Sequence, residues 1–177
     1  MKFGTTSEAA ISENPVDFCI HLALAVFKRQ KTVTYKPLSR RDQRLRTAGD
    51  VVVSPYGQVG DVLWVREPFG FLDGAVVYQA SYAQDGYRGR MTLPYDLEVP
   101  PVSMVREQAR MLLTIQTIDV VTLQSVDEAA AVAAGTIPTQ DRTTYLDEFK
   151  AQWDEAYRRE QWSTNPSVWR MTFTLND

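Results

Sequence analysis

The chain has 177 residues, of which 44% are hydrophobic and 23% charged, values that exclude a wholly disordered chain and fit one domain. Its net charge of −3 excludes the broad basic surface that wholesale binding of duplex DNA requires. A single cysteine, Cys19, excludes an internal disulfide. Because His21 is also the single histidine, no zinc ligand set is available, and we expect neither a metal nor a cofactor.

The N-terminal residues lack the basic start and apolar run of a signal peptide. No stretch approaches the roughly 18 apolar residues of a membrane span. We therefore expect a cytoplasmic protein without a membrane partner. Residues 1–16 are polar and predict a loose N-terminal arm, which leaves residues 17–177 as a single domain.

The hydrophobic periodicity alternates between helix-like and strand-like segments along this domain. Helices are indicated by apolar residues three or four apart, and strands by β-branched or aromatic residues at every second position. In chain order, the patterns predict a helix over Asp17–Arg29, strands over Lys31–Lys36, Asp61–Val65 and Ala75–Ala80, a long loop over 84–103, a strand over Ala109–Leu123, a helix ending at Ala134, a helix over Tyr145–Tyr157 and a strand over Val168–Leu175.

Local signals support the boundaries of the helix before Gly135. Ser125 and Glu128 have the spacing of a capping box, in which each side chain accepts a hydrogen bond from an otherwise unpaired amide. Gly135 is typical of a helix end. Several strands with a few helices and no strand–helix–strand alternation predict a closed or sandwiched β fold with appended helices.

The candidate chemistry gathers in the segment that contains Lys31, Thr32 and Thr34. In a regular strand both threonines share one face and the lysine lies on the other, and the residues form an ordinary surface strand. If the segment is instead a turn entering a strand, Lys31 and Thr34 converge. A lysine in a partly apolar cleft loses its proton more readily and can activate a hydroxyl.

Two further charged features leave their roles open. Arg66 and Glu67 follow an apolar strand, where they either bind a ligand or form a salt bridge with each other or with neighbours. The cationic segment from Lys28 to Arg46 either attracts phosphate or is a solvated surface. The chain has no glycine-rich phosphate loop and no nucleophilic serine elbow.

Six motifs occur in an order that resembles the ASCH (activating signal cointegrator homology) family. Residues 56–67, Tyr-Gly-Gln-Val-Gly-Asp-Val-Leu-Trp-Val-Arg-Glu, are similar to the phage-type sequence Tyr-Gly-x-x-Gly-Asp-x-Leu-Trp-Val-Arg-Glu and form the most specific match. Residues 30–34 resemble part of the family signature Gly-Arg-Lys-Thr-x-Thr-Arg-Arg. The other similar segments are 77–80, 104–110, 119–135, and Phe149 and Trp153 with 165–169.

The resemblance implies an α+β fold, a PUA-like β-barrel with flanking helices, encoded by a phage or prophage. It also implies a cleft for single-stranded RNA or a modified nucleoside. One bacterial branch is an amidohydrolase that removes the acetyl group of N4-acetylcytidine with a Lys, a Thr and a Glu. The ligand-binding residues implied here are Lys31, Thr32, Thr34, Lys36, Arg66, Glu67, Arg106 and Arg110.

Carried onto this chain, the catalytic lysine and threonine are Lys31 and Thr34, whereas the glutamate position holds Ala134. Amide hydrolysis needs a group that shuttles protons to the leaving amine, and such help is typically worth about 10²–10⁴-fold in rate. We therefore expect nucleobase binding. The alternatives are an amidohydrolase that acts on a modified nucleoside, and a protein-interaction module with a vestigial cleft.

Overall fold

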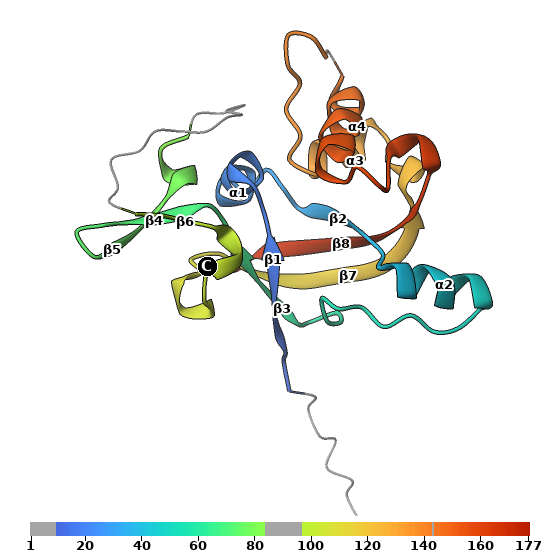
Figure 1. Ribbon diagram of the computed structural model, residues 1–177, viewed down its shortest axis with the longest axis horizontal. Coiled ribbons are helices and arrows are strands. Elements are labelled where there is room, and N and C mark those ends of the chain that lie inside the picture. The colour runs from blue at the N-terminus through green and yellow to red at the C-terminus, as the bar shows by residue number, and fades with distance from the viewer. Residues whose placement is uncertain (1–9, 84–96, 143) are drawn as a thin grey trace, which may run out of the picture.

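The computed structural model describes residues 10–83, 97–142 and 144–177. It is a mixed α+β structure with a five-stranded sheet and a separate three-stranded sheet (Figure 1). The larger sheet has the strand order β1-β3-β7-β8-β2. Its strands are β1 (Glu13–Asp17), β2 (Val33–Pro37), β3 (Val62–Arg66), β7 (Leu112–Thr122) and β8 (Ser167–Leu175).

The larger sheet is open, so the predicted closed barrel is wrong. Strands β1 and β2 end the strand order, and neither pairs with the other. β1 runs parallel to β3, and the remaining pairs are antiparallel. Because a helix can cover an apolar strand face as well as a closing strand can, the apolar faces of the strands did not require closure.

The smaller sheet has the order β5-β4-β6, from strands β4 (Phe69–Leu72), β5 (Ala75–Tyr78) and β6 (Leu97–Val99). Asp73 and Gly74 both have positive φ, as the two-residue turn of a tight hairpin requires. The strand predicted over Ala75–Ala80 ends at Tyr78 and belongs to this smaller sheet, apart from the other predicted strands. Most of the loop expected over 84–103 lies outside the described residues.

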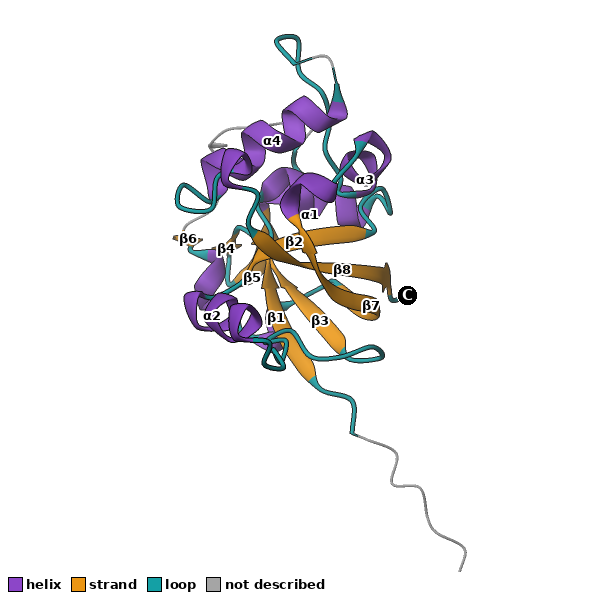
Figure 2. Ribbon diagram, turned by 90° about the vertical axis from the view of Figure 1, so that its right-hand side faces the viewer, coloured by secondary structure: helices purple, strands orange, loops and turns teal. Residues whose placement is uncertain are grey.

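Three of the helices lie together on one side of the strands, whereas α2 lies apart from them (Figure 2). The helices are α1 (Ile20–Phe27), α2 (Arg40–Ala48), α3 (Glu128–Ala133) and α4 (Tyr145–Ala156). The sequence analysis did not predict α2, because its arginines hide any apolar periodicity. Short 3₁₀ turns occupy Gln79–Ser81, Pro101–Ser103, Arg106–Gln108, Leu123–Ser125 and Trp162–Thr164.

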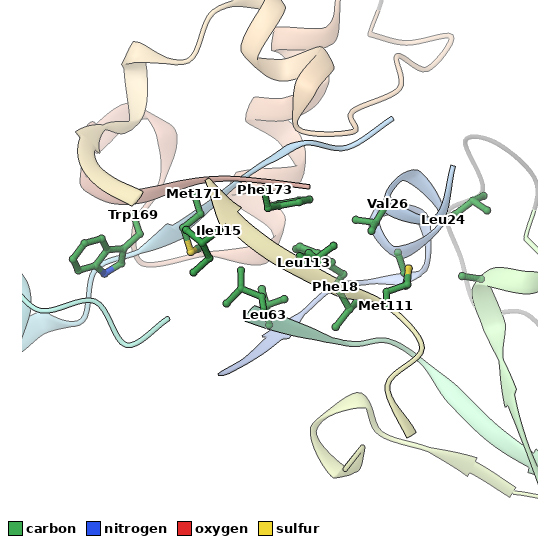
Figure 3. Packing of buried hydrophobic residues seen from close by; sticks show 14 of the residues in the cluster. Phe18, Leu24, Val26, Leu63, Met111, Leu113, Ile115, Trp169, Met171 and Phe173 are labelled. Atoms are coloured by element: carbon green, nitrogen blue, oxygen red, sulfur yellow. The ribbon is translucent and has the colours of Figure 1, made fainter. Parts of the chain in front are cut away.

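Two hydrophobic clusters make up the core, and alternation along the strands divides residues between them. In β8, Val168 belongs to the cluster beneath α3 and α4, and Trp169 to the cluster beneath α1. Figure 3 shows the α1 cluster, in which Leu113 and Ile115 of β7 meet Met171 and Phe173 of β8, Leu63 of β3, and Phe18, Leu24 and Val26.

Two predicted boundaries are corrected by the structure. Residues 13–16, assigned to the N-terminal arm, lie in β1 and pair with β3. The capping box is also wrong, because α3 is capped by Asp127, whose carboxylate accepts from the amide of Ala130. Glu128 instead caps α4, where it accepts from the amides of Tyr145 and Leu146. A capping box satisfies amides of its own helix, whereas Glu128 satisfies those of a neighbouring helix.

Gly135, which follows α3, permits a close approach that a side chain would block. Its φ is +78°, and a Cβ there would lie 2.9 Å from the Cβ of Ala25 and 3.0 Å from the Cβ of Lys31. Gly74 has the same φ of +78° with no atom within 4 Å of its Cβ position. Substitutions at these two glycines therefore distinguish the cost of backbone strain from the cost of steric overlap.

We expect Gly135→Ala to destabilise the protein more than Gly74→Ala. Both substitutions impose the left-handed backbone cost of about 1–2 kcal/mol, and Gly135→Ala adds overpacking of about 1–3 kcal/mol. Urea unfolding of both variants measures the difference. Equal losses in free energy of unfolding would show that α3 is not held against Ala25 and Lys31.

Candidate functional site

The amino group of Lys31 lies buried between α1, β2 and the end of α3. The residue is 4% exposed. Its Nζ donates to the carbonyl oxygen of Val33 at 2.7 Å and to that of Ala134 at 2.8 Å, and it lies 5.1 Å from the centre of the Phe18 ring. An ammonium group has three donors, so one hydrogen is left without a partner among the described residues.

Burial and, to a smaller extent, the positive charge of Lys36 together lower the pKa of Lys31 from its ordinary value of 10.5 to about 7. Desolvation disfavours the charged form of a lysine because the interior does not replace the lost hydration. Near neutral pH, Lys31 therefore exchanges between a cationic donor and a neutral amine, which is the property that a general base or a protonation-dependent binding group needs.

A small cavity of about 70 Å³ adjoins Lys31. A volume of this size admits a small substituent or the edge of a ring, because pockets for whole drug-sized ligands span about 300–1,000 Å³. Most of its walls are apolar, and polar groups enter at a few points. The lining residues are Leu22, Lys31, Ala134, Thr136, Phe149, Gln152 and Trp153.

Thr34 and Lys36 lie on the face of β2 opposite Val33 and Tyr35, which belong to the cluster beneath α3 and α4. Lys36 reaches Phe18, with its Nζ 5.4 Å from the ring centre, and donates to the carbonyl of Asp17 at 2.8 Å. Desolvation is the largest cause that lowers the pKa of Lys36. Lys31 and Lys36 therefore converge on one aromatic ring.

A series of polar contacts that the sequence did not predict borders the cleft formed by Lys31, Lys36, Phe18 and the cavity. The Cys19 Sγ lies 3.3 Å from Nδ1 of His21, and Nε2 of His21 lies 3.2 Å from Oε1 of Gln152. The Gln152 amide donates to Glu148 at 3.3 Å, and Glu148 is fully buried. The buried carboxylate therefore fixes Gln152, which in turn orients the imidazole toward the thiol.

A sequence signal for part of this chain exists. Glu148 and Gln152 are four residues apart on α4, each directly before an aromatic core residue, Phe149 or Trp153. Polar residues beside a buried helical stripe lie at its edge. Nothing in the sequence indicates that Cys19 and His21 meet this edge, because 131 positions separate His21 from Gln152.

Glu67 and Arg110 form a separate ion pair. Arg110 donates to both carboxylate oxygens, at 2.7 and 2.9 Å, and its guanidinium lies 4.2 Å from the centre of the Tyr78 ring. Glu67 is 1% exposed, and desolvation raises its pKa although Arg110 opposes this shift. No hydrogen bond joins Glu67 to Lys31 within the described residues.

The other expected site residues lie outside the cleft. Arg66 pairs with Asp17, and Arg106 pairs with Glu13, so both arginines meet carboxylates of β1. Thr32 is exposed, and its amide donates to the carbonyl of Ala133. Thus Lys31, Thr34 and Lys36 share one region, whereas Arg66, Arg106 and the Glu67–Arg110 pair are held by other contacts.

Ala134 stands at the position where the resemblance implies a glutamate. The residue is buried, and its carbonyl oxygen accepts from Lys31. Among the described residues, no group of three or more potential ligand side chains that could hold a metal is found. Likewise, none of the helices in this part of the chain is long and apolar enough to cross a membrane.

No family model and no curated protein matches the sequence. Among solved structures, an ASCH domain from Lactobacillus crispatus JV V101 is similar at 13% identity with a TM-score of 0.46, over 93% of this chain and 79% of that one. A DUF984 protein from Enterococcus faecalis V583 is similar at 15% identity with a TM-score of 0.40, over 88% and 67%. Because both scores are low, the proposals for this chain rest on its own residues.

We expect Lys31 to make stability depend on pH. Its pKa is near 7 in the folded protein and near its ordinary value of 10.5 after unfolding. Between these values the unfolded chain holds more protons, so stability rises with pH by up to about 1.4 kcal/mol per pH unit. Lys31→Met retains much of the side-chain volume without the titrating group, and its free energy of unfolding should have a smaller slope.

Urea unfolding of both proteins at several pH values between the two pKa values measures this slope. The comparison uses slopes because Lys31→Met also leaves two buried carbonyl oxygens unpaired, which lowers stability at every pH. The same slope in both proteins would mean that Lys31 keeps its ordinary pKa in the folded state.

Proposed function

We propose that the domain binds a nucleobase of single-stranded RNA or of a modified nucleoside, with the edge of the base in the cavity beside Lys31. The observation that carries this proposal is the buried amino group of Lys31, with one hydrogen to spare, at a cavity with aromatic and aliphatic walls. Binding sites for small aromatic ligands combine such walls with a few placed polar groups.

The polar groups at the cavity match the edge of a base. Lys31 offers a donor, Thr136 a hydroxyl, and Gln152 an amide that its contacts with His21 and Glu148 hold in place. The apolar walls include Phe149 and Trp153. Because the cavity admits only an edge, the sugar and phosphate of the ligand remain outside it.

The remaining expected residues take different parts in this proposal. Neither Thr34 nor Lys36 lines the cavity, so we assign both to the part of the ligand that stays outside it, on the Phe18 side of β2 that Lys36 shares with the Lys31 amino group. Glu67 and Arg110 neutralise each other and support the fold beside α1. Arg66, Arg106 and Thr32 do not line the cavity, and no contact with the base is proposed for them.

We expect nucleoside and short RNA affinity to fall as pH rises through the pKa of Lys31, which is about 7. The cationic form has a third hydrogen for a charge-assisted hydrogen bond worth about 1.5–3 kcal/mol, whereas both hydrogens of the neutral amine are already used by the carbonyls of Val33 and Ala134. Below that pH, Lys31→Met should weaken binding by about tenfold or more. Calorimetry with nucleosides and fluorescence anisotropy with labelled single-stranded RNA provide the measurements.

Thr32→Val is the matched control, since it changes an exposed residue next to Lys31 and should leave binding and its pH dependence unchanged. Thr34→Val should have an intermediate effect. The proposal fails if neither nucleosides nor RNA bind at low salt, or if Lys31→Met binds as tightly as the unchanged protein at every pH.

A second candidate function is amide hydrolysis on a modified nucleoside, favoured by the lowered pKa of Lys31, which provides a base at neutral pH. Two features oppose it: the Lys31 amino group is already bound to two carbonyl oxygens, and Ala134 offers no side-chain carboxylate. We expect little or no release of acetate from N4-acetylcytidine, measured by mass spectrometry. Rapid release that Lys31→Met abolishes would establish the enzyme instead.

The ordered motifs support the further proposal that this chain is an ASCH-like, PUA-like domain. Its phage origin and its cytoplasmic location stay predictions from the sequence.

A further inference from the structure

Helix α2 is well formed although it buries none of its residues. Ser39 caps its start, where the hydroxyl accepts from the amide of Asp42 at 3.1 Å. Gly49 ends it with a φ of +82°, and the amide of Asp50 closes the last turn on Leu45. A helix of nine residues is marginal without packing. The caps therefore hold α2 in place as an exposed helix.

The positive charges on α2 destabilise the helix. Arg40, Arg41, Arg44 and Arg46 share nine residues with one acid, Asp42. Like charges three or four positions apart destabilise a helix by about 0.2–0.5 kcal/mol per pair. Within residues 10–83, 97–142 and 144–177, no carboxylate forms a salt bridge with these four arginines. A bound polyanion would remove this repulsion.

One face of α2 opens into grooves. Arg40, Gln43, Arg44 and Thr47, spaced three or four apart, line a groove of about 630 Å³ with Ala48. A second groove, of about 740 Å³, runs between α2 and the segment after α4. It is lined by Arg40, Gln43, Arg159, Glu160, Thr164 and Pro166. Arg40 and Gln43 line both grooves. Arg41 and Arg46 line neither of them.

Two stretches of the chain connect the α2 groove with the Lys31 cleft. Arg40 lies four positions after Lys36 in the sequence, and the Lys36 amino group donates to the carbonyl of Asp17 and lies over the Phe18 ring. Arg159 follows Tyr157, whose phenol lies close enough to Asp17 and Cys19 for their charges to raise its pKa, after the larger effect of burial. Both walls of the groove are thus extensions of segments that border the cleft.

We propose that the α2 groove, with Arg40, Arg44 and Arg159, binds the phosphodiester backbone of single-stranded RNA whose base enters the cavity at Lys31. This inference rests on the proposed nucleobase function for the base, and on the α2 groove for the backbone. Arginine guanidinium groups suit phosphate oxygens, and the Gln43 amide, which uses one of its two hydrogens on the carbonyl of Leu38, adds a neutral donor. Glu160 also lines the second groove, and its negative charge opposes phosphate binding there.

The test compares two double variants with the same change in charge on the same helix. Arg40→Gln with Arg44→Gln alters the groove face, and Arg41→Gln with Arg46→Gln alters the other positions. Glutamine has nearly the helix propensity of arginine, so α2 should persist in both variants, as circular dichroism can verify. Binding of labelled single-stranded RNA is measured over a range of salt concentrations, together with calorimetry on a nucleoside.

We expect the groove variant to weaken RNA binding by about tenfold at low salt. It should also reduce the magnitude of the slope of log affinity against log salt by about 1.4, or about 0.7 for each lost phosphate contact. Nucleoside affinity should not change. The control variant should retain a slope within a few tenths of the original, and Arg159→Gln added to the groove variant should lower the slope again.

The outcomes separate this inference from the proposed function. If nucleosides bind but RNA binds no tighter, or if both double variants lose affinity equally, the groove is not a backbone site although the nucleobase function stands. If RNA binds through the groove and nucleosides do not bind, the inference stands and the nucleobase function fails. Tight binding of an acidic protein, with no RNA binding at low salt, would overturn both.

Discussion

The buried amino group of Lys31 is the interaction on which the candidate site depends. It links two carbonyl oxygens that belong to different parts of the chain, Val33 of β2 and Ala134 at the end of α3. Gly135 makes the approach possible because any side chain there would overlap Ala25 and Lys31. Lys31 thus joins α1, β2 and α3, and its amino group, which has a lowered pKa, lies beside an aromatic ring.

An open sheet with helices provides this site more readily than a closed barrel would. β2 is an edge strand, and its residues alternate between two faces, one of which belongs to the cluster beneath α3 and α4. The alternation places Thr34 and Lys36 toward Phe18, and places Val33 and Tyr35 against α3 and α4. The edge position also lets the chain leave the sheet after Pro37 and form α2 away from the core, where its arginines remain in water.

The proposed site divides recognition between two kinds of contact. A cavity of about 70 Å³ can read the edge of a base but leaves the backbone of a nucleic acid outside. The grooves beside α2 provide cationic side chains, and among the described residues no aromatic side chain that would stack on a base lines them. In nucleic-acid recognition, backbone contacts supply affinity and position, whereas contacts with bases supply specificity. The net charge of −3 is compatible with this arrangement because four of the 19 cationic residues gather on α2 with one acid.

The sequence by itself determined the local elements and one part of the candidate site. Apolar spacing identified α1, α4, β3, β7 and β8 to within a few residues, because an element that buries one face must repeat its apolar residues at the period of that element. The motif around Lys31 indicated the lysine and Thr34. Only the tertiary structure decided that the sheet stays open, that Ala75 begins a strand of a second sheet, that Glu67 pairs with Arg110, and that Cys19 and His21 meet Gln152. These features join residues that are far apart in the chain. The spacing of apolar residues within one segment carries no information about which distant residue will pair with a charge or cover an apolar face.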